Sequence, residues 1–286
     1  MSNFERLQDH VTDGSIRLIH VEAVPRSVST ALSRALNETD GPSVYVNEPF
    51  NRMKHDIDAA AGHILDAAVP MVDTATEPVT VVTKNMARNL SSKIFRQWMP
   101  ITDGVVWSVR NPLIQIGSLL TRIANDIVIE PGADQITQDE LAPYINESSD
   151  FLENSGISKG FSKTSWAEIG THYRSGYQPE RSIVIDGDDF ARQPERILGR
   201  TCLLLGLNYS SRMTGGWQRG YVNANDGYSD KLSDTENGWT KHAASSTGIS
   251  ESTRQALNLE DLPPNLREHI EEVAIPVYEE MTGLSV

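Results

Sequence analysis

The fold class that this sequence predicts is α/β, a single domain with a central, mostly parallel sheet and helices on both faces. Short β-rich apolar runs alternate with helix-compatible segments from residue 16 onward. This rhythm is typical of parallel strands joined by crossover helices. At 286 residues the chain can bury a full core, and no internal repeat or long linker divides it. We therefore expect one domain over residues 1–286.

Five short runs are predicted as strands, because β-branched and other apolar residues dominate them. They span residues 16–24, 44–46, 79–84, 104–109 and 182–185. Apolar residues at helical spacing, or Ala-rich and acidic composition, predict helices between and after them. These helices span residues 31–37, 53–69, 88–98, 113–129, 138–154, 165–173, 195–205 and 266–281. Pro100 stops the helix over 88–98, Gly206 ends the helix over 195–205, and Pro276 interrupts the last one.

Residues 208–252 are rich in Gly, Ser, Asn and Asp and show no clear period. Long irregular regions in compact domains are often functional. This region is therefore either a lid that covers a substrate or a solvated excursion of the chain, and the sequence leaves both alternatives open.

The charge balance excludes some classes of partner. The net charge is −14 and the sequence pI is about 4.9, so a general nucleic-acid or acidic-membrane binder is disfavoured. A small anionic ligand held by a few local Arg and Lys side chains remains compatible. Cys202 is the single cysteine, so no intrachain disulfide framework forms. The sequence shows neither a signal-peptide pattern nor an apolar run of ~18 residues, which makes the cytoplasm the expected compartment.

The stretch PRSVST, residues 25–30, lies between the first strand and the first helix. A helix N-terminus presents free N–H groups, so Arg26 and the hydroxyls of Ser27, Ser29 and Thr30 suit phosphate or sulfate oxygens. The alternative is that Ser27 only caps an ordinary helix. The stretch is not a nucleotide triphosphate loop of the form G-x-x-x-x-G-K-[ST], because it has no glycine and its basic residue precedes the first serine.

Four charged residues follow the predicted strands at their carboxyl ends. They are Arg26, Glu48, Lys84 and Arg110. In an open parallel sheet the ligand site lies beyond these ends, so residues far apart in sequence converge there. We therefore expect one shared site at this edge.

The run VRNPLIQIGS forms a second motif. Arg110 stands at a strand end, Pro112 near the first turn of the next helix, and Ser118 about two turns into it. Ser118 can face back to Arg110 only if a ligand lies along that helix. On its own, a serine in this position is most often a helix-surface or back-bonding residue.

Both motifs resemble signatures of the PAPS-dependent sulfotransferases. Their 5′-phosphosulfate loop, P-[KR]-S-G-[ST]-T, is matched throughout residues 25–30 except at Val28, which replaces the glycine. A sulfotransferase-like branch with the loop P-R-N-V-S-T-A-L is also similar to this stretch. The second signature is R-[ND]-P with a serine eight residues after the Arg. Residues 182–207 resemble the family's strand, acidic turn and helix, and residues 238–248 give a weaker echo.

The resemblance implies a P-loop-like fold, PAPS as donor, and a role for each matched residue. Arg26 would stabilise the leaving 5′-phosphate. Its oxygens would be held by Ser27, the backbone of Val28, Ser29 and Thr30. Arg110 and Ser118 would select the 3′-phosphate.

Lys84 matches a family lysine near the sulfuryl group, with a surface lysine after a strand as the alternative.

The general base is less clearly marked. Many cytosolic family members have a histidine where this chain has Met86. Other branches use a glutamate after the first helix, and Glu48 fits that place, with its pKa held low by a nearby Arg26. The alternative is that Glu48 forms a structural pair with an arginine. His55 and His63 are further substitutes, although lone histidines are more often surface residues.

The adenine contact and the metal content follow the same comparison. The family aromatic after the loop is replaced by Ala31, so some other ring would have to stack on the base, and Trp239 or Tyr221 from the irregular region could do so. No cluster has metal-ligand spacing and sulfuryl transfer needs no metal, so none is expected.

These features predict a sulfotransferase that transfers a sulfuryl group from PAPS to a hydroxyl or amine of a small-molecule acceptor. We expect neither a nucleic acid nor a membrane as partner, and the oligomeric state stays open. Within this chemistry, sulfation can be final or can activate a hydroxyl for elimination. Two other classes are a catalytically silent PAP- or PAPS-binding module and, less well supported, a kinase-like ATP enzyme, which lacks its motif here.

Overall fold

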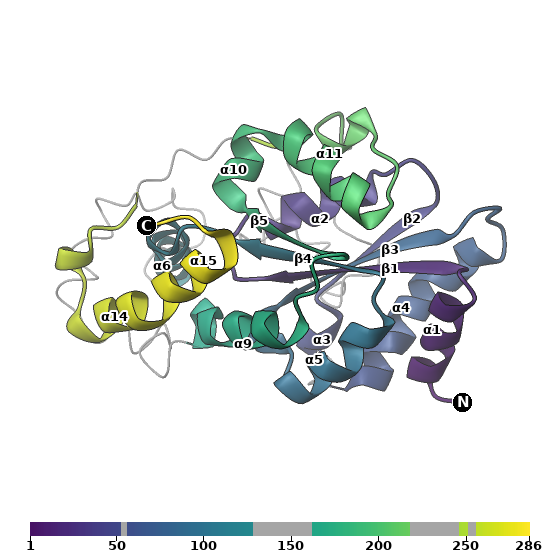
Figure 1. Ribbon diagram of the computed structural model, residues 1–286, viewed down its shortest axis with the longest axis horizontal. Coiled ribbons are helices and arrows are strands. Elements are labelled where there is room, and N and C mark those ends of the chain that lie inside the picture. The colour runs from purple at the N-terminus through teal and green to yellow at the C-terminus, as the bar shows by residue number, and fades with distance from the viewer. Residues whose placement is uncertain (53–55, 128–161, 218–245, 251–255) are drawn as a thin grey trace.

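The computed structural model describes residues 1–52, 56–127, 162–217, 246–250 and 256–286. The helix predicted over 138–154 lies outside these residues, as do Trp239, Tyr221 and most of the irregular region over 208–252. The described residues form an α/β fold around one sheet, with helices on both faces (Figure 1).

The sheet has five parallel strands in the order β2-β3-β1-β4-β5. The strands are β1 (Ile16–Ala23), β2 (Ser43–Asn47), β3 (Val79–Met86), β4 (Gly104–Val109) and β5 (Ser182–Asp186). Every predicted strand is therefore confirmed. β1 is central, and the chain passes from one side of it to the other between β3 and β4. Ligands bind at such a reversal of strand order, beyond the carboxyl ends.

The inner strands are buried on both faces, as parallel strands covered by helices must be. All eight residues of β3 are buried, and Ile16 to Ala23 of β1 pair in register with Val79 to Met86. Val and Thr dominate β3 because their branched side chains suit the pleated surface.

Helices cover both faces of the sheet (Figure 1). On one side lie α2 (Ser29–Asn37), α10 (Gly187–Arg192) and α11 (Pro194–Leu205). The other side carries α1 (Asn3–Thr12), α3 (Pro49–Arg52), α4 (Ile57–Val72), α5 (Ser92–Trp98) and α9 (Trp166–Gly176). Beyond the carboxyl end of the sheet lie α6 (Pro112–Ile127), α14 (Pro264–His269) and α15 (Ile275–Thr282).

Several helix predictions need correction. The helix predicted over 88–98 begins only at Ser92, because Ser91 caps it through Ile94 N–H and a 3₁₀ turn occupies 87–89. The sequence reading missed α1, which a Ser2 capping box starts. It also took the start of α10 for a turn, although Asp186 caps this short helix. The last helix departs from α geometry in a π turn over 270–274, just before Pro276.

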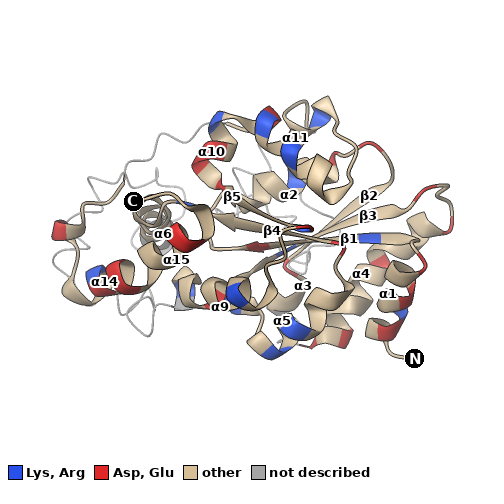
Figure 2. Ribbon diagram, viewed as in Figure 1, with Lys and Arg blue, Asp and Glu red and all other residues tan. Residues whose placement is uncertain are grey.

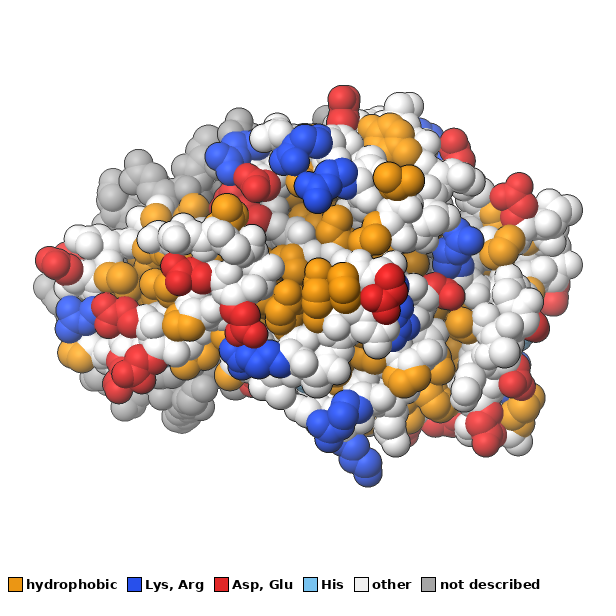
Figure 3. All heavy atoms as spheres, in the orientation of Figure 1, with side chains coloured by type: hydrophobic (Ala, Val, Ile, Leu, Met, Phe, Trp, Pro, Cys, Tyr) orange, Lys and Arg blue, Asp and Glu red, His pale blue; other side chains and the backbone are white. Residues whose placement is uncertain are grey.

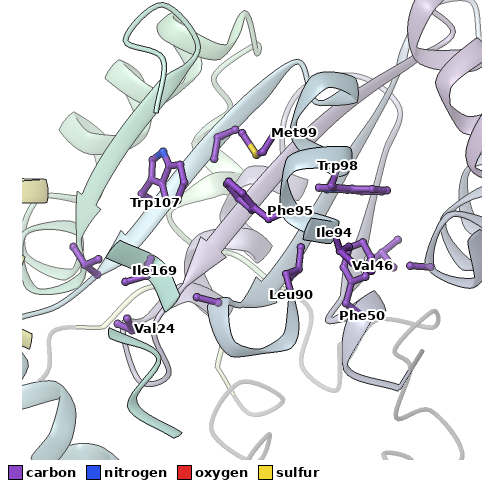
Figure 4. Packing of buried hydrophobic residues seen from close by; sticks show 14 of the residues in the cluster. Val24, Val46, Phe50, Leu90, Ile94, Phe95, Trp98, Met99, Trp107 and Ile169 are labelled. Carbon is purple, nitrogen blue, oxygen red and sulfur yellow. The ribbon is translucent and has the colours of Figure 1, made fainter. Parts of the chain in front are cut away.

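Two apolar clusters fill the space between the sheet and its helices. The larger lies under the α5 and α9 side, where Phe50 meets Trp98 edge to face at 5.1 Å and Phe95 lies beside Trp107 (Figure 4). The smaller lies under α2 and α11 and includes Cys202, which is buried as its apolar surroundings predict.

A buried polar network interrupts the larger cluster. Glu22, on β1, is fully buried and accepts hydrogen bonds from His20 Nε2 at 3.0 Å and from His172 Nδ1 at 2.6 Å. Trp98 donates to His20 Nδ1, so that nitrogen is an acceptor and Nε2 carries the proton. Buried charge persists only when it is hydrogen-bonded, and this network meets that requirement.

Acidic and basic positions are interspersed over the helices in the view of Figure 2. A band of hydrophobic side chains crosses the middle of the face in Figure 3. A groove of about 810 Å³ runs along β5 and is lined by residues of α11 and α15. No helix of the described part of the chain is long and apolar enough to cross a membrane.

Candidate active site

The loop after β1 has an unusual backbone. Arg26 and Val28 both have φ of 65°, in the left-handed region that side chains with a Cβ rarely adopt. Val28 is the N-cap of α2 and makes no side-chain capping bond. Val28 occupies the position of the glycine in the motif P-[KR]-S-G-[ST]-T, and a glycine would adopt this backbone conformation without strain. Left-handed residues in a turn are typical of backbone nests that aim N–H groups at an anion.

Ser27 is committed to the loop itself. Its hydroxyl donates to the carbonyl of Val24 at 2.7 Å and lies 3.0 Å from the hydroxyl of Ser108 on β4. Ser27 does not act as the helix cap, so that alternative is wrong. The hydroxyl holds the loop to the strand ends, which leaves anion contact to backbone groups and to Ser29 and Thr30.

The two predicted motifs touch directly. Arg26 donates from Nε to the hydroxyl of Ser118 on α6, at 3.1 Å. Ser118 is buried, so the helix-surface alternative is wrong. Gln115, one turn earlier on α6, donates to the carbonyl of Pro25 at 2.7 Å. Two side chains of α6 therefore fix the position of the loop.

Lys84 and Glu48 form a second group next to the loop. Lys84 Nζ lies 3.0 Å from Oε1 of Glu48 and 3.5 Å from the hydroxyl of Thr30. Lys84 is only 2% exposed, which rules out a surface lysine. Glu48 forms an ion pair with this lysine and not with an arginine, so the alternative of a structural pair with an arginine is wrong. Glu48 also has a positive φ, 49°.

The second carboxylate oxygen of Glu48 is also hydrogen-bonded. Oε2 accepts from the side-chain amides of Asn51 at 2.9 Å and Asn89 at 3.2 Å. Burial raises the pKa of Glu48, but the charge of Lys84 and the hydrogen bonds from Asn51 and Lys84 outweigh burial and bring the pKa below its usual value. The nearest charge that lowers this pKa is Lys84, not Arg26 as expected. Glu48 is therefore held as a carboxylate.

Arg110 forms an ion pair across the sheet end. Its Nε and Nη2 both donate to Oδ1 of Asp188 on α10, at 2.9 and 2.6 Å. The arginine side chain is 4% exposed and the aspartate 22%. Gly187, the preceding residue, lies against the loop: a Cβ there would be 2.5 Å from the carbonyl oxygen of Ser27. The start of α10 therefore contacts both predicted motifs.

The structure brings all the predicted site residues to one end of the sheet, but in three groups. Arg26 contacts Ser118, and Lys84 contacts Glu48 and Thr30, whereas Arg110 contacts Asp188. Sequence reading missed Asn51, Asn89, Gln115 and Asp188. An asparagine three residues after a candidate base was the one available signal, because side chains at i and i+3 are neighbours in a helical turn. The groove along β5 contains none of the predicted site residues.

No group of three or more His, Cys, Asp or Glu side chains within the described ranges is placed to hold a metal ion. The donor set at the strand ends consists of cations, hydroxyls and N–H groups, which suits phosphate or sulfate oxygens.

The solved structures that this chain resembles include sulfotransferases. The sulfotransferase domain from the curacin biosynthetic pathway is 14% identical with a TM-score of 0.46, over 90% of this chain and 97% of that one. The sulfotransferase from Alicyclobacillus acidocaldarius is also 14% identical with a TM-score of 0.46, over 73% and 84% of the two chains. A mouse sulfotransferase complexed with PAP is 10% identical with a TM-score of 0.45, over 97% and 89%.

No protein-family model matches the chain, and no curated protein matches its sequence. Similarities of 10–14% identity concern the course of the backbone. They assign neither a donor, an acceptor nor a residue role to this protein.

Proposed function

We propose that this protein is a sulfotransferase that moves a sulfuryl group from PAPS to a hydroxyl or amine of a small-molecule acceptor. The observation that carries the proposal is the contact of Arg26 with Ser118, beside the buried pair of Lys84 and Glu48. It joins both sulfotransferase-like motifs at the carboxyl end of a parallel sheet, where such folds bind ligands.

PAPS supplies an activated sulfuryl group on a 5′-phosphate and carries a 3′-phosphate for recognition. Arg26, Ser29, Thr30 and the backbone at Val28 would hold the 5′-phosphate and stabilise its charge as it leaves. Ser27 would contribute through its backbone, because its hydroxyl is committed to Val24. Arg110 and Ser118 would hold the 3′-phosphate.

Lys84 and Glu48 would act at the reacting centre. Lys84 would place a positive charge beside the sulfuryl oxygens. These oxygens stay negatively charged throughout the transfer, so the lysine would stabilise them. Glu48 would accept the proton that the acceptor loses as its oxygen or nitrogen bonds to sulfur. Asn51 and Asn89 would orient that carboxylate through Oε2.

A ligand-binding comparison tests the donor. The melting temperature is measured with PAP, with AMP and with ATP plus Mg²⁺, for the wild type, Arg110→Ala and Arg174→Ala. Arg174 is an exposed arginine paired with Glu280 and serves as the matched control. A ligand at a hundred times its Kd stabilises the folded state by ~2.7 kcal/mol. We expect PAP to stabilise the wild type and the control more than AMP does, and Arg110→Ala to lose the difference.

Stabilisation by ATP with Mg²⁺ and not by PAP would overturn the proposal in favour of a kinase-like enzyme. Because Arg110 is buried, Arg110→Lys is a second variant: it keeps a charge and removes the planar fork. Turnover is then measured with PAPS and a panel of small alcohols and amines.

A second candidate, a silent PAP-binding module, is favoured by one observation. Glu48 accepts three hydrogen bonds and its lowered pKa makes it a weak base. The module would bind PAP as tightly after Glu48→Gln and show no sulfated product from any acceptor. Product formation that Glu48→Gln abolishes would exclude it.

A further inference from the structure

The ion pair of Arg110 and Asp188 raises a question that the proposed function leaves open. Arg110 is the residue to which we assign the 3′-phosphate, and it already holds a carboxylate. A buried arginine needs a partner anion, because an unpaired buried charge is strongly unfavourable. In the ligand-free protein Asp188 fills that need.

The geometry of the pair is that of a replaceable partner. The two nitrogens of Arg110 that donate to Asp188, Nε and Nη2, both bond to one oxygen, Oδ1. The strongest arginine–carboxylate pairs use both carboxylate oxygens. The aspartate side chain is 22% exposed and the arginine 4%. Asp188 can therefore turn toward water while Arg110 stays in place.

The surrounding charge also favours exchange. Asp186 and Asp189 lie in the same turn as Asp188. Burial raises the pKa of Asp186, and the charge of Asp188 adds to this effect. Asp189 is already paired with Arg192 at 2.5 Å. Among the described residues around this turn, Arg110 is therefore the one cation that loses its ion-pair partner when Asp188 moves into water.

We propose that Asp188 is an internal competitor for the anion site at Arg110, which a 3′-phosphate must displace in order to bind. This inference rests on the proposed function. A phosphate monoester carries close to two negative charges and three acceptor oxygens, against one charge for the carboxylate. It can displace Asp188 from Arg110. A 3′-hydroxyl has neither property and leaves the ion pair intact.

Asp188 is a residue that acts through Arg110, so its test measures binding of two nucleotides that differ in the 3′-phosphate. The Kd values of PAP and AMP are measured by titration calorimetry at one fixed salt concentration. The variants are Asp188→Asn, Asp189→Asn and Asp188→Asn combined with Arg110→Ala. Asp188→Asn keeps a carbonyl oxygen that can accept from Arg110, so it removes the charge and retains the hydrogen bond. Asp189→Asn removes the same charge from the same turn without touching Arg110.

We expect Asp188→Asn to bind PAP about tenfold more tightly than the wild type and to bind AMP with unchanged Kd. Asp189→Asn should leave both values near those of the wild type. The double variant should lose the preference for PAP over AMP, because the gain acts through Arg110.

Weaker PAP binding by Asp188→Asn would overturn the inference, because Asp188 would then orient Arg110 for the phosphate. Equal effects of Asp188→Asn and Asp189→Asn would overturn it as well, because only net charge would matter. If PAP binds the wild type, either result leaves the proposed function standing. If neither the wild type nor Asp188→Asn binds PAP, the proposed function fails and the inference fails with it.

Discussion

The ammonium nitrogen of Lys84 lies 3.0 Å from Oε1 of Glu48, and the two side chains are 3% and 13% exposed. Lys84 lies within β3, at the last position that pairs with β2, and Glu48 directly follows β2, the neighbouring strand in the sheet. The backbone continues this contact, since Glu48 N–H donates to the carbonyl of Lys84 at 2.6 Å. One adjacent strand pair therefore builds the reacting end of the proposed site.

Removing one charge of this pair should be costly. Glu48→Gln leaves Lys84 buried without a counter-charge, and we expect the free energy of unfolding to fall by about 3 kcal/mol, as for other broken buried pairs. Urea denaturation measures the change. Glu48→Gln combined with Lys84→Met should recover most of the loss, because the uncompensated charge is gone. Equal stability of wild type and Glu48→Gln would show that the pair is solvated.

At position 28, we expect a glycine variant to be more stable than an alanine variant, which is the reverse of the usual order of stability. In ordinary helical or extended backbone, glycine is less stable than alanine by about 0.5–1 kcal/mol. At a φ of 65° the Cβ of valine or alanine is strained, by roughly 1–2 kcal/mol. We expect Val28→Gly to be more stable toward urea than Val28→Ala, because both lose the packing of the valine methyls against the smaller apolar cluster and only alanine keeps a strained Cβ. A more stable Val28→Ala would mean that the loop is not left-handed there.

Gly187→Ala should disturb the loop from outside. The added Cβ would lie 2.5 Å from the Ser27 carbonyl oxygen, so the backbone must shift. We expect a loss of about 1–3 kcal/mol of stability, typical of overpacking, together with weaker PAP binding. The control is Gly199→Ala in α11, where a Cβ meets no atom within 4 Å. That variant should gain up to about 1 kcal/mol from helix propensity and bind PAP normally.

Glu22 should make the stability of the fold depend on pH. Burial raises the pKa of Glu22, but the hydrogen bonds from His172 and His20 outweigh burial and leave the pKa below its ordinary value of 4.5. A carboxyl whose pKa is lowered in the folded state stabilises the fold above the unfolded pKa. This contribution is lost as the pH falls through the folded pKa.

Glu22→Gln removes this contribution. Its unfolding free energy should lie furthest below that of the wild type above pH 4.5, by about 2 kcal/mol or more, and the two curves should converge as the pH falls. Denaturation series between pH 3 and pH 8 measure both. Glu280→Gln, at an exposed pair with Arg174, should run parallel to the wild type. A constant gap between wild type and Glu22→Gln would contradict the ionised state of Glu22.

Much of the fold could be predicted from the sequence, because apolar period and β-branched content are local properties. The five strands and the helices α2, α6, α9 and α11 were predicted with small errors at their ends. The failures have local causes too. The helix α1 and the cap of α10 depend on single polar side chains, Ser2 and Asp186, whose capping bonds leave no trace in the apolar pattern.

The sequence by itself determined which residue types stand at the strand ends, and therefore that Arg26, Glu48, Lys84 and Arg110 would gather at one edge of a parallel sheet. Only the tertiary structure decided their partners. Strand order places Glu48 next to Lys84, and the start of α10 places Asp188 against Arg110. Such pairings join residues 36 and 78 positions apart, and they depend on side-chain packing that no local pattern encodes.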